Sequence, residues 1–182
     1  MKNLKIENIA ESLAIKINKN YPESSSVAVL KFGLIGLINL LFSVIIVLLI
    51  GGLSDHFSAA VLAVLGFPLL RYYSGGIHFS SANLCSLVTS FFMLISMYYN
   101  VEYWYNGLIL NLISIILLLL YAPAGIKKSN IKKEHYPRLK FVSALIVLSN
   151  LFFQSEVLTT AFFIQSITTT PVVQGLVRKI NL

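Results

Sequence analysis

The sequence contains one cysteine and few charged residues. Cys85 stands alone among 182 residues, which excludes an intramolecular disulfide and a zinc site built from several thiolates. Charged residues form 12% of the chain and hydrophobic residues 57%, too little polar surface to enclose the core of a soluble domain. The first twenty residues also lack an uninterrupted apolar run, so we expect no cleavable signal peptide. The composition therefore predicts a protein embedded in lipid.

The net charge of +7 does not indicate a nucleic-acid partner. The basic residues stand between long apolar runs instead of following a polar helix or an aromatic sheet face. The histidines give no metal site either, because His56 and His135 are expected on opposite sides of the membrane. We expect neither a metal nor another cofactor.

Six apolar segments predict an all-α, polytopic membrane protein with about six transmembrane helices. They run from Val27 to Ile50, Phe57 to Leu70, Leu84 to Tyr99, Gly107 to Ala122, Phe141 to Phe153 and Leu158 to Leu176. A spanning helix needs about 20 apolar residues, so we expect the short second and fifth segments to thin the bilayer, to extend into their flanks or to be partly re-entrant. Asn39, Asn111 and Asn150 interrupt these runs and are expected to form hydrogen bonds between helices.

The charge distribution predicts the orientation. With the N-terminus inside, every Lys and Arg is cytoplasmic, while the predicted outer loops carry Asp55, Glu102 and Glu156. This arrangement follows the positive-inside rule. It predicts that both termini are cytoplasmic.

We interpret residues 1–182 as a single membrane-embedded domain. Residues 1–26 form an N-terminal interfacial segment, 27–176 the six-helix region and 177–182 a cytoplasmic tail. The interfacial segment has apolar residues at helical spacing, such as Ile6, Ala10 and Leu13, with Glu7 and Glu11 among the charged residues between them. The pattern is typical of an amphipathic helix that anchors the topology or holds a membrane-bound substrate.

Residues 71–85, between the second and third segments, carry most of the available chemistry. On one straight helix His78 and Cys85 would lie about 10 Å apart, too far for proton transfer, so this stretch must bend. Gly75 and Gly76 permit the bend, and Ser80 or Ser81 can cap a helix that starts directly afterwards. Cys85 then falls in the first turn, where the helix N-terminus favours the thiolate and apolar burial opposes it. Taken singly, Cys85 could pack as a small hydrophobic residue, and Arg71 could simply mark the membrane boundary.

With these residues, the chain resembles the AgrB (accessory gene regulator protein B) family of bacterial membrane endopeptidases. The resemblance covers nearly the whole chain. The strongest match is the spacing of Arg71, Gly76, His78 and Cys85. A second match, Tyr121-Ala-Pro-Ala-Gly-Ile-Lys-Lys, follows the fourth segment, but the next residues, Ser129-Asn130-Ile131, depart from the Lys-Pro-Ile type expected there.

The resemblance implies that Cys85 is the nucleophile and His78 the general base, while Arg71, Gly76 and Ser81 form or position the site. It implies an AgrD-like quorum-sensing propeptide as substrate, cleaved near its C-terminal end through a thioester that a substrate cysteine converts into a thiolactone. It also implies the plasma membrane of a Gram-positive bacterium. Whether a homodimer is required stays open.

The basic loop, Lys127, Lys128, Lys132, Lys133, Arg138 and Lys140, is expected to contact anionic membrane lipids or to attract the acidic tail of the propeptide. Two other interpretations of the chain remain. One is a small transporter or membrane scaffold without peptidase activity. The other is a peptidase that hydrolyses its substrate without forming a ring.

Overall fold

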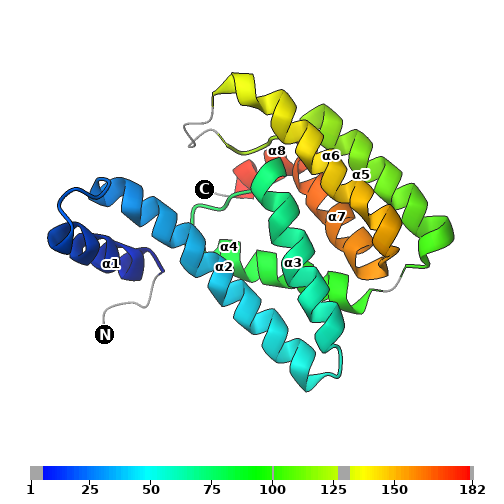
Figure 1. The fold of residues 1–182 in the computed structure, drawn as a ribbon, viewed down its shortest axis with the longest axis horizontal. Coiled ribbons are helices and arrows are strands. Elements are labelled where there is room, and N and C mark those ends of the chain that lie inside the picture. The colour runs from blue at the N-terminus through cyan, green and yellow to red at the C-terminus, as the bar shows by residue number, and fades with distance from the viewer. Residues whose placement is uncertain (1–5, 100, 127–131, 181–182) are drawn as a thin grey trace.

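The fold is all-helical, as the sequence predicts. A computed structural model describes residues 6–99, 101–126 and 132–180, and within these ranges it contains helices and one isolated bridge between Gly75 and Ala124 (Figure 1). The helices are α1 (Ile6–Asn20), α2 (Val27–Leu53), α3 (Phe57–Ser74), α4 (Ala82–Tyr98), α5 (Leu108–Tyr121), α6 (Tyr136–Phe153), α7 (Glu156–Thr168) and α8 (Pro171–Ile180). A short π-helix, η1 (Tyr103–Gly107), precedes α5, and a 3-10 turn, η2 (Lys133–His135), precedes α6.

Among the described residues, four helical stretches are long and apolar enough to cross a membrane. They are Val27–Leu53, Phe57–Ser74, Tyr103–Tyr121 and Lys133–Phe153. The predicted number of about six is therefore not confirmed. α4 is apolar but has 17 residues. α7 has 13 residues, or about 20 Å of helix, against a hydrocarbon core of about 30 Å.

The predicted sixth span, Leu158 to Leu176, is not one continuous helix. α7 ends at Thr168 and α8 begins at Pro171, because proline cannot continue a helix but suits the first position of a new one. α7 is buried along most of its length, so it packs among other helices. The boundary predicted between residues 176 and 177 falls inside α8.

The two short apolar segments extend into their flanks. α3 continues past Leu70 to Ser74, and α6 begins at Tyr136 instead of Phe141. The extension of α3 carries Arg71 on its last turn, which brings a charged side chain to the end of a spanning helix.

A helix does form in the N-terminal segment. α1 buries Ile6, Ala10 and Ala14, and its Glu11 carboxylate lies 2.9 Å from Lys31 Nζ of α2. Ile9 and Leu13 are each 40% exposed. Its position at a membrane interface stays a prediction.

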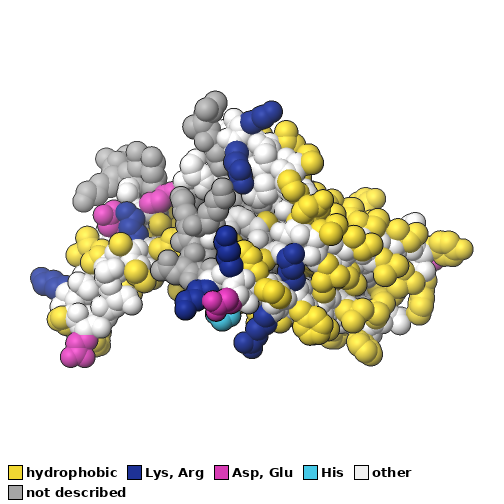
Figure 2. Space-filling model, turned by 90° about the horizontal axis from the view of Figure 1, so that it is seen from above, with side chains coloured by type: hydrophobic (Ala, Val, Ile, Leu, Met, Phe, Trp, Pro, Cys, Tyr) yellow, Lys and Arg dark blue, Asp and Glu magenta, His cyan; other side chains and the backbone are white. Residues whose placement is uncertain are grey.

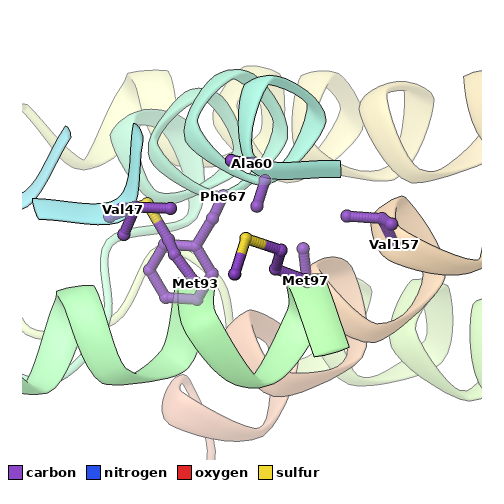
Figure 3. Packing of buried hydrophobic residues seen from close by; sticks show 8 residues of the cluster. Val47, Ala60, Phe67, Met93, Met97 and Val157 are labelled. Carbon is purple, nitrogen blue, oxygen red and sulfur yellow. The ribbon is translucent and has the colours of Figure 1, made fainter. Parts of the chain in front are cut away.

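An apolar cluster joins α2, α3, α4 and α7 (Figure 3). Its buried members are Val47, Ala60, Ala63, Phe67, Met93, Met97, Val157 and Ala161. Next to it, α3 and α7 approach closely at Gly66, where an added Cβ would lie 2.5 Å from Leu158 Cδ2. The absence of a side chain at Gly66 therefore permits the close contact.

Polar side chains connect the helices elsewhere, as predicted for the three asparagines. Asn39 Oδ1 of α2 accepts a hydrogen bond from Ser86 Oγ of α4 at 2.7 Å. Asn150 Nδ2 and Asn111 Nδ2 both donate to Thr159 Oγ1 of α7, at 2.9 Å and 3.4 Å. These bonds attach α6 and α5 to the buried α7.

The charged side chains are unevenly distributed over the face drawn in Figure 2. Lys, Arg, Asp and Glu side chains gather over the left and central parts, whereas hydrophobic side chains cover most of the right-hand part. A polar region and an apolar region are expected of a protein that lies partly in lipid. Which side faces the cytoplasm stays a prediction.

Candidate active site

The chain bends between α3 and α4, as the sequence predicts. Gly75 N donates to Arg71 O at 2.9 Å and ends α3. Gly75 and Gly76 have φ values of 70° and 139°, in the region that favours glycine. The residues up to Ser81 are not helical, so His78 and Cys85 do not share a straight helix.

The turn at Gly75 and Gly76 pairs with the segment after α5. Gly76 N donates to Ala124 O, and Ala124 N donates to Ser74 O, each at 2.9 Å. An added Cβ on Gly75 would lie 2.0 Å from Ala124 O, and one on Gly125 would lie 2.1 Å from Gly76 O. The two sequence motifs therefore meet in one structure that leaves no room for side chains at these glycines.

α7 supports the other side of the same turn. Gln165 Nε2 donates to Ser74 Oγ at 2.9 Å and to Gly75 O at 2.6 Å. An added Cβ on Gly76 would lie 2.8 Å from Thr168 Oγ1. Sequence reasoning missed Gln165 and Thr168, although polar residues within an apolar segment were an available signal.

Arg71 reaches from α3 to both the turn and the cysteine. Its Nη2 donates to the carbonyl oxygen of Ile77 and lies 3.9 Å from Cys85 Sγ. A guanidinium at this distance stabilises negative charge on the sulfur. The structure thus brings together two of the residues that the sequence singled out.

Cys85 lies in the first turn of α4, as predicted, and is partly buried. Its backbone N donates to Ser81 O at 3.1 Å. His78 lies outside α4 and is exposed, with its ring beside Gly125: an added Cβ there would lie 3.3 Å from His78 Cδ2. Since Ile77 O and Cys85 Sγ share one Arg71 nitrogen, the backbone that leads into His78 lies close to the thiol.

Ser81 occupies the position before α4, but its side chain does not cap the helix. Instead, Glu7 Oε1 of α1 accepts a hydrogen bond from Ala82 N at 2.9 Å. Asn83 Oδ1 accepts a second bond from Ile6 N at 3.4 Å. The start of α1 therefore packs against the N-terminus of the helix that carries Cys85, and the Ala82 N–H is hydrogen-bonded to Glu7.

Two lysines of the predicted basic loop, Lys127 and Lys128, lie outside the described residues. Lys132 and Lys133 are exposed. Lys140 Nζ donates to Leu119 O and Leu120 O at 3.0 Å and 3.3 Å, so this lysine caps the end of α5. Over the part of the chain that the structure describes, no three His, Cys, Asp or Glu side chains gather in a way that could hold a metal ion.

Comparisons with known proteins indicate the family. The family model of accessory gene regulator B matches residues 6–177. A protein of Halalkalibacterium halodurans that is described only as AgrB-like is 24% identical, with 97% of this chain and 92% of that protein covered. An AgrB-like protein of Clostridium perfringens is 28% identical, with 88% of this chain and 80% of that protein covered. No solved structure is significantly similar to the chain. The chain therefore belongs to the AgrB family, and this membership supports a role in the processing of quorum-sensing peptides.

Proposed function

We propose that the protein is a membrane cysteine endopeptidase that cleaves an AgrD-like propeptide near its C-terminal end, with Cys85 as nucleophile and His78 as general base. The observation that supports it best is the pair of contacts made by Arg71 Nη2, to Ile77 O and to Cys85 Sγ. They lie within the stretch whose residue spacing matches the family motif. Family membership supports the class of substrate.

The first half of the reaction forms an acyl-enzyme. His78 takes the proton from the Cys85 thiol, and the sulfur attacks the carbonyl carbon of the scissile peptide bond. The C–N bond then breaks, and His78 returns its proton to the departing amine. Arg71 stabilises the negative charge that the sulfur carries before attack. The N-terminal part of the propeptide stays bound to Cys85 as a thioester.

The second half releases the peptide. A cysteine thiol within the bound peptide attacks the thioester carbon, forms a thiolactone and leaves Cys85 as a free thiol. One thioester replaces another, so no ATP is consumed. Attack by water would instead give a linear acid, so exclusion of water favours ring formation.

The remaining predicted residues fit around this chemistry. Gly76 leaves room for α7 and Arg71 beside the turn, and Ser81 marks the start of α4. Lys127, Lys128, Lys132 and Lys133 would attract anionic lipid or an acidic propeptide tail. We place the single domain in the bacterial cell membrane, with both termini in the cytoplasm.

The test is to co-express the wild type, Cys85→Ala and His78→Ala with propeptides encoded nearby and to measure cleavage by mass spectrometry. We expect no cleavage by Cys85→Ala and a loss of about 10² to 10⁴-fold for His78→Ala, the usual contribution of a general base. A ring product lacks one water relative to the linear product, which separates cyclisation from hydrolysis.

The control is the amount of each variant in the membrane and its resistance to thermal unfolding. If well-folded variants still cleave the propeptide, the proposal that Cys85 and His78 carry out the cleavage is wrong. A different protease, or a scaffold in which Cys85 and His78 are packing residues, would then be the better interpretation.

A further inference from the structure

We infer that Gln165 of α7 is a positioning residue for Cys85: its side-chain amide fixes the Gly75–Gly76 turn so that Arg71 reaches the thiol. The inference deepens the proposed function and rests on Cys85 as its nucleophile. Sequence motifs do not indicate it, since Gln165 stands 80 residues after Cys85, near the C-terminal end of the chain.

Gln165 connects two consecutive residues at the end of α3. Its side chain is fully buried at 0% exposure. Nε2 donates one hydrogen to Ser74 Oγ and the other to Gly75 O, at 2.9 Å and 2.6 Å. Both bonds cross from α7 to the turn and neither contributes to the backbone bonding of α7 itself. Removing the amide would leave the Gly75 carbonyl buried without this donor, which costs more than an exposed bond would.

The same amide and the guanidinium of Arg71 both lie against Gly76. The position of an added Cβ on Gly76 is 3.1 Å from Gln165 Nε2 and 3.3 Å from Arg71 Nη1. Gly76 is thus enclosed by both side chains. Any shift of the turn toward α7 or away from it would move the backbone against which Arg71 is placed.

The turn also fixes what Arg71 can contact. Arg71 Nη2 donates to Ile77 O, directly after the two glycines, and lies 3.9 Å from Cys85 Sγ. On one side the turn is bonded to Ala124, and on the other to Gln165. With the second support removed, the Ile77 carbonyl would no longer hold the guanidinium in reach of the sulfur.

The hydrogen bonding of Gln165 favours a positioning role over a stabilising one. Its Oε1 is buried and has no hydrogen-bond partner among the described residues, and such a group costs free energy. A methionine of similar volume would avoid that cost but could not donate to Ser74 and Gly75. The Gln165 amide therefore serves more to position the turn than to stabilise the fold.

The test measures alkylation of Cys85 by iodoacetamide in the purified full-length protein, because the chain has a single thiol. We expect Gln165→Met to react about tenfold more slowly than the wild type, because the Arg71 guanidinium no longer stands beside the attacking sulfur. Arg71→Met should show a similar loss. The double variant should be no slower than Arg71→Met, since both changes remove one shared interaction.

Gln174→Met is the matched control. Gln174 of α8 donates from Nε2 to the backbone oxygen of Thr168 at 2.8 Å, so this variant loses an amide hydrogen bond near the end of α7 but keeps the Thr168 side chain and the Gln165 amide that contact the turn. It should react at the wild-type rate. If Gln165→Met does not fold, Gln165→Asn replaces it, because the shorter side chain cannot reach both acceptors and should also slow alkylation.

A wild-type alkylation rate in a folded Gln165 variant would overturn the inference, as would losses for Gln165→Met and Arg71→Met that multiply in the double variant. A loss shared equally by Gln174→Met would show a general effect of α7 and would overturn it too. The assay contains no propeptide. Its result is therefore separate from the cleavage experiment, in which failure would count against the peptidase proposal itself.

Discussion

The apolar cluster around Phe67 and the turn at Gly75 both depend on α3, yet they are held together in different ways. Phe67 is fully buried among side chains of α2, α4 and α7, where contact depends on shape and volume. The turn is held by hydrogen bonds to Ala124 and Gln165 and by the absence of side chains on its glycines. Changes in side-chain volume in the cluster should therefore lower the stability of the protein. Changes that shift the turn or remove its hydrogen bonds should lower the reactivity of Cys85.

Among the changes that test this comparison, Gly75→Ala should have the largest effect on activity. The new Cβ would lie 2.0 Å from the backbone oxygen of Ala124, at a φ of 70°, so the turn must move. We expect cleavage to fall by at least about 10²-fold, since displacing catalytic groups by about 1 Å has that effect. Gly33→Ala is the control, because nothing lies within 4 Å of its added Cβ. Equal activities of the two variants would contradict the account of the turn.

Phe67→Ala should act on stability instead. It removes a fully buried ring and should lower the free energy of unfolding by about 3 kcal/mol, measured by thermal or denaturant unfolding in detergent. The alkylation rate of Cys85 per folded molecule should fall less than in Arg71→Met, because the hydrogen bonds that hold the turn come from Ala124 and Gln165 and not from Phe67.

Phe152→Ala makes the same substitution at a side chain that is 87% exposed, and it should change stability little. If Phe67→Ala slowed alkylation as strongly as Arg71→Met, the two regions would not be separable. The comparison on which both predictions rest would then fail.

The smallest effect should come from Glu7→Gln. An amide oxygen can still accept the bond from Ala82 N that Glu7 Oε1 now accepts at 2.9 Å, but the negative charge at the start of α4 is lost. We expect a loss of stability of about 0.5 kcal/mol, typical of a charge at a helix N-terminus, with little change in alkylation. The control is Glu11→Gln, which removes the charge of the exposed pair with Lys31. If Glu7→Gln lowered cleavage as much as Gly75→Ala does, α1 would instead be part of the site.

The local parts of the site could be predicted from the sequence. Gly75 and Gly76 readily adopt the positive φ values that the turn after α3 requires. The start of α4 after Ser81 was predicted from the same short stretch, although the Ser81 side chain does not cap the helix. This placed Cys85 in the first turn of α4. The roles of Cys85 and His78 stay predictions that the experiments above test.

The long-range parts could not be predicted. Glu7 meets Ala82, Ala124 meets Gly75 and Gln165 meets Ser74 across long stretches of chain, and no local pattern encodes such pairs. The same limit explains why the structure of α7 was not predicted. Hydropathy records that Leu158 to Leu176 is apolar but not whether a helix faces lipid or protein, so α7 was expected to span the membrane and is in fact short and buried.

The central claim is that Cys85 carries the peptide as a thioester. The most direct measurement is the intact mass of the wild-type protein and of Cys85→Ala after brief exposure to the propeptide and acid quenching. The account predicts an added mass equal to the N-terminal part of the propeptide on the wild type, released by hydroxylamine and absent from Cys85→Ala. Cleavage without any such adduct, or an equal adduct on Cys85→Ala, would contradict it.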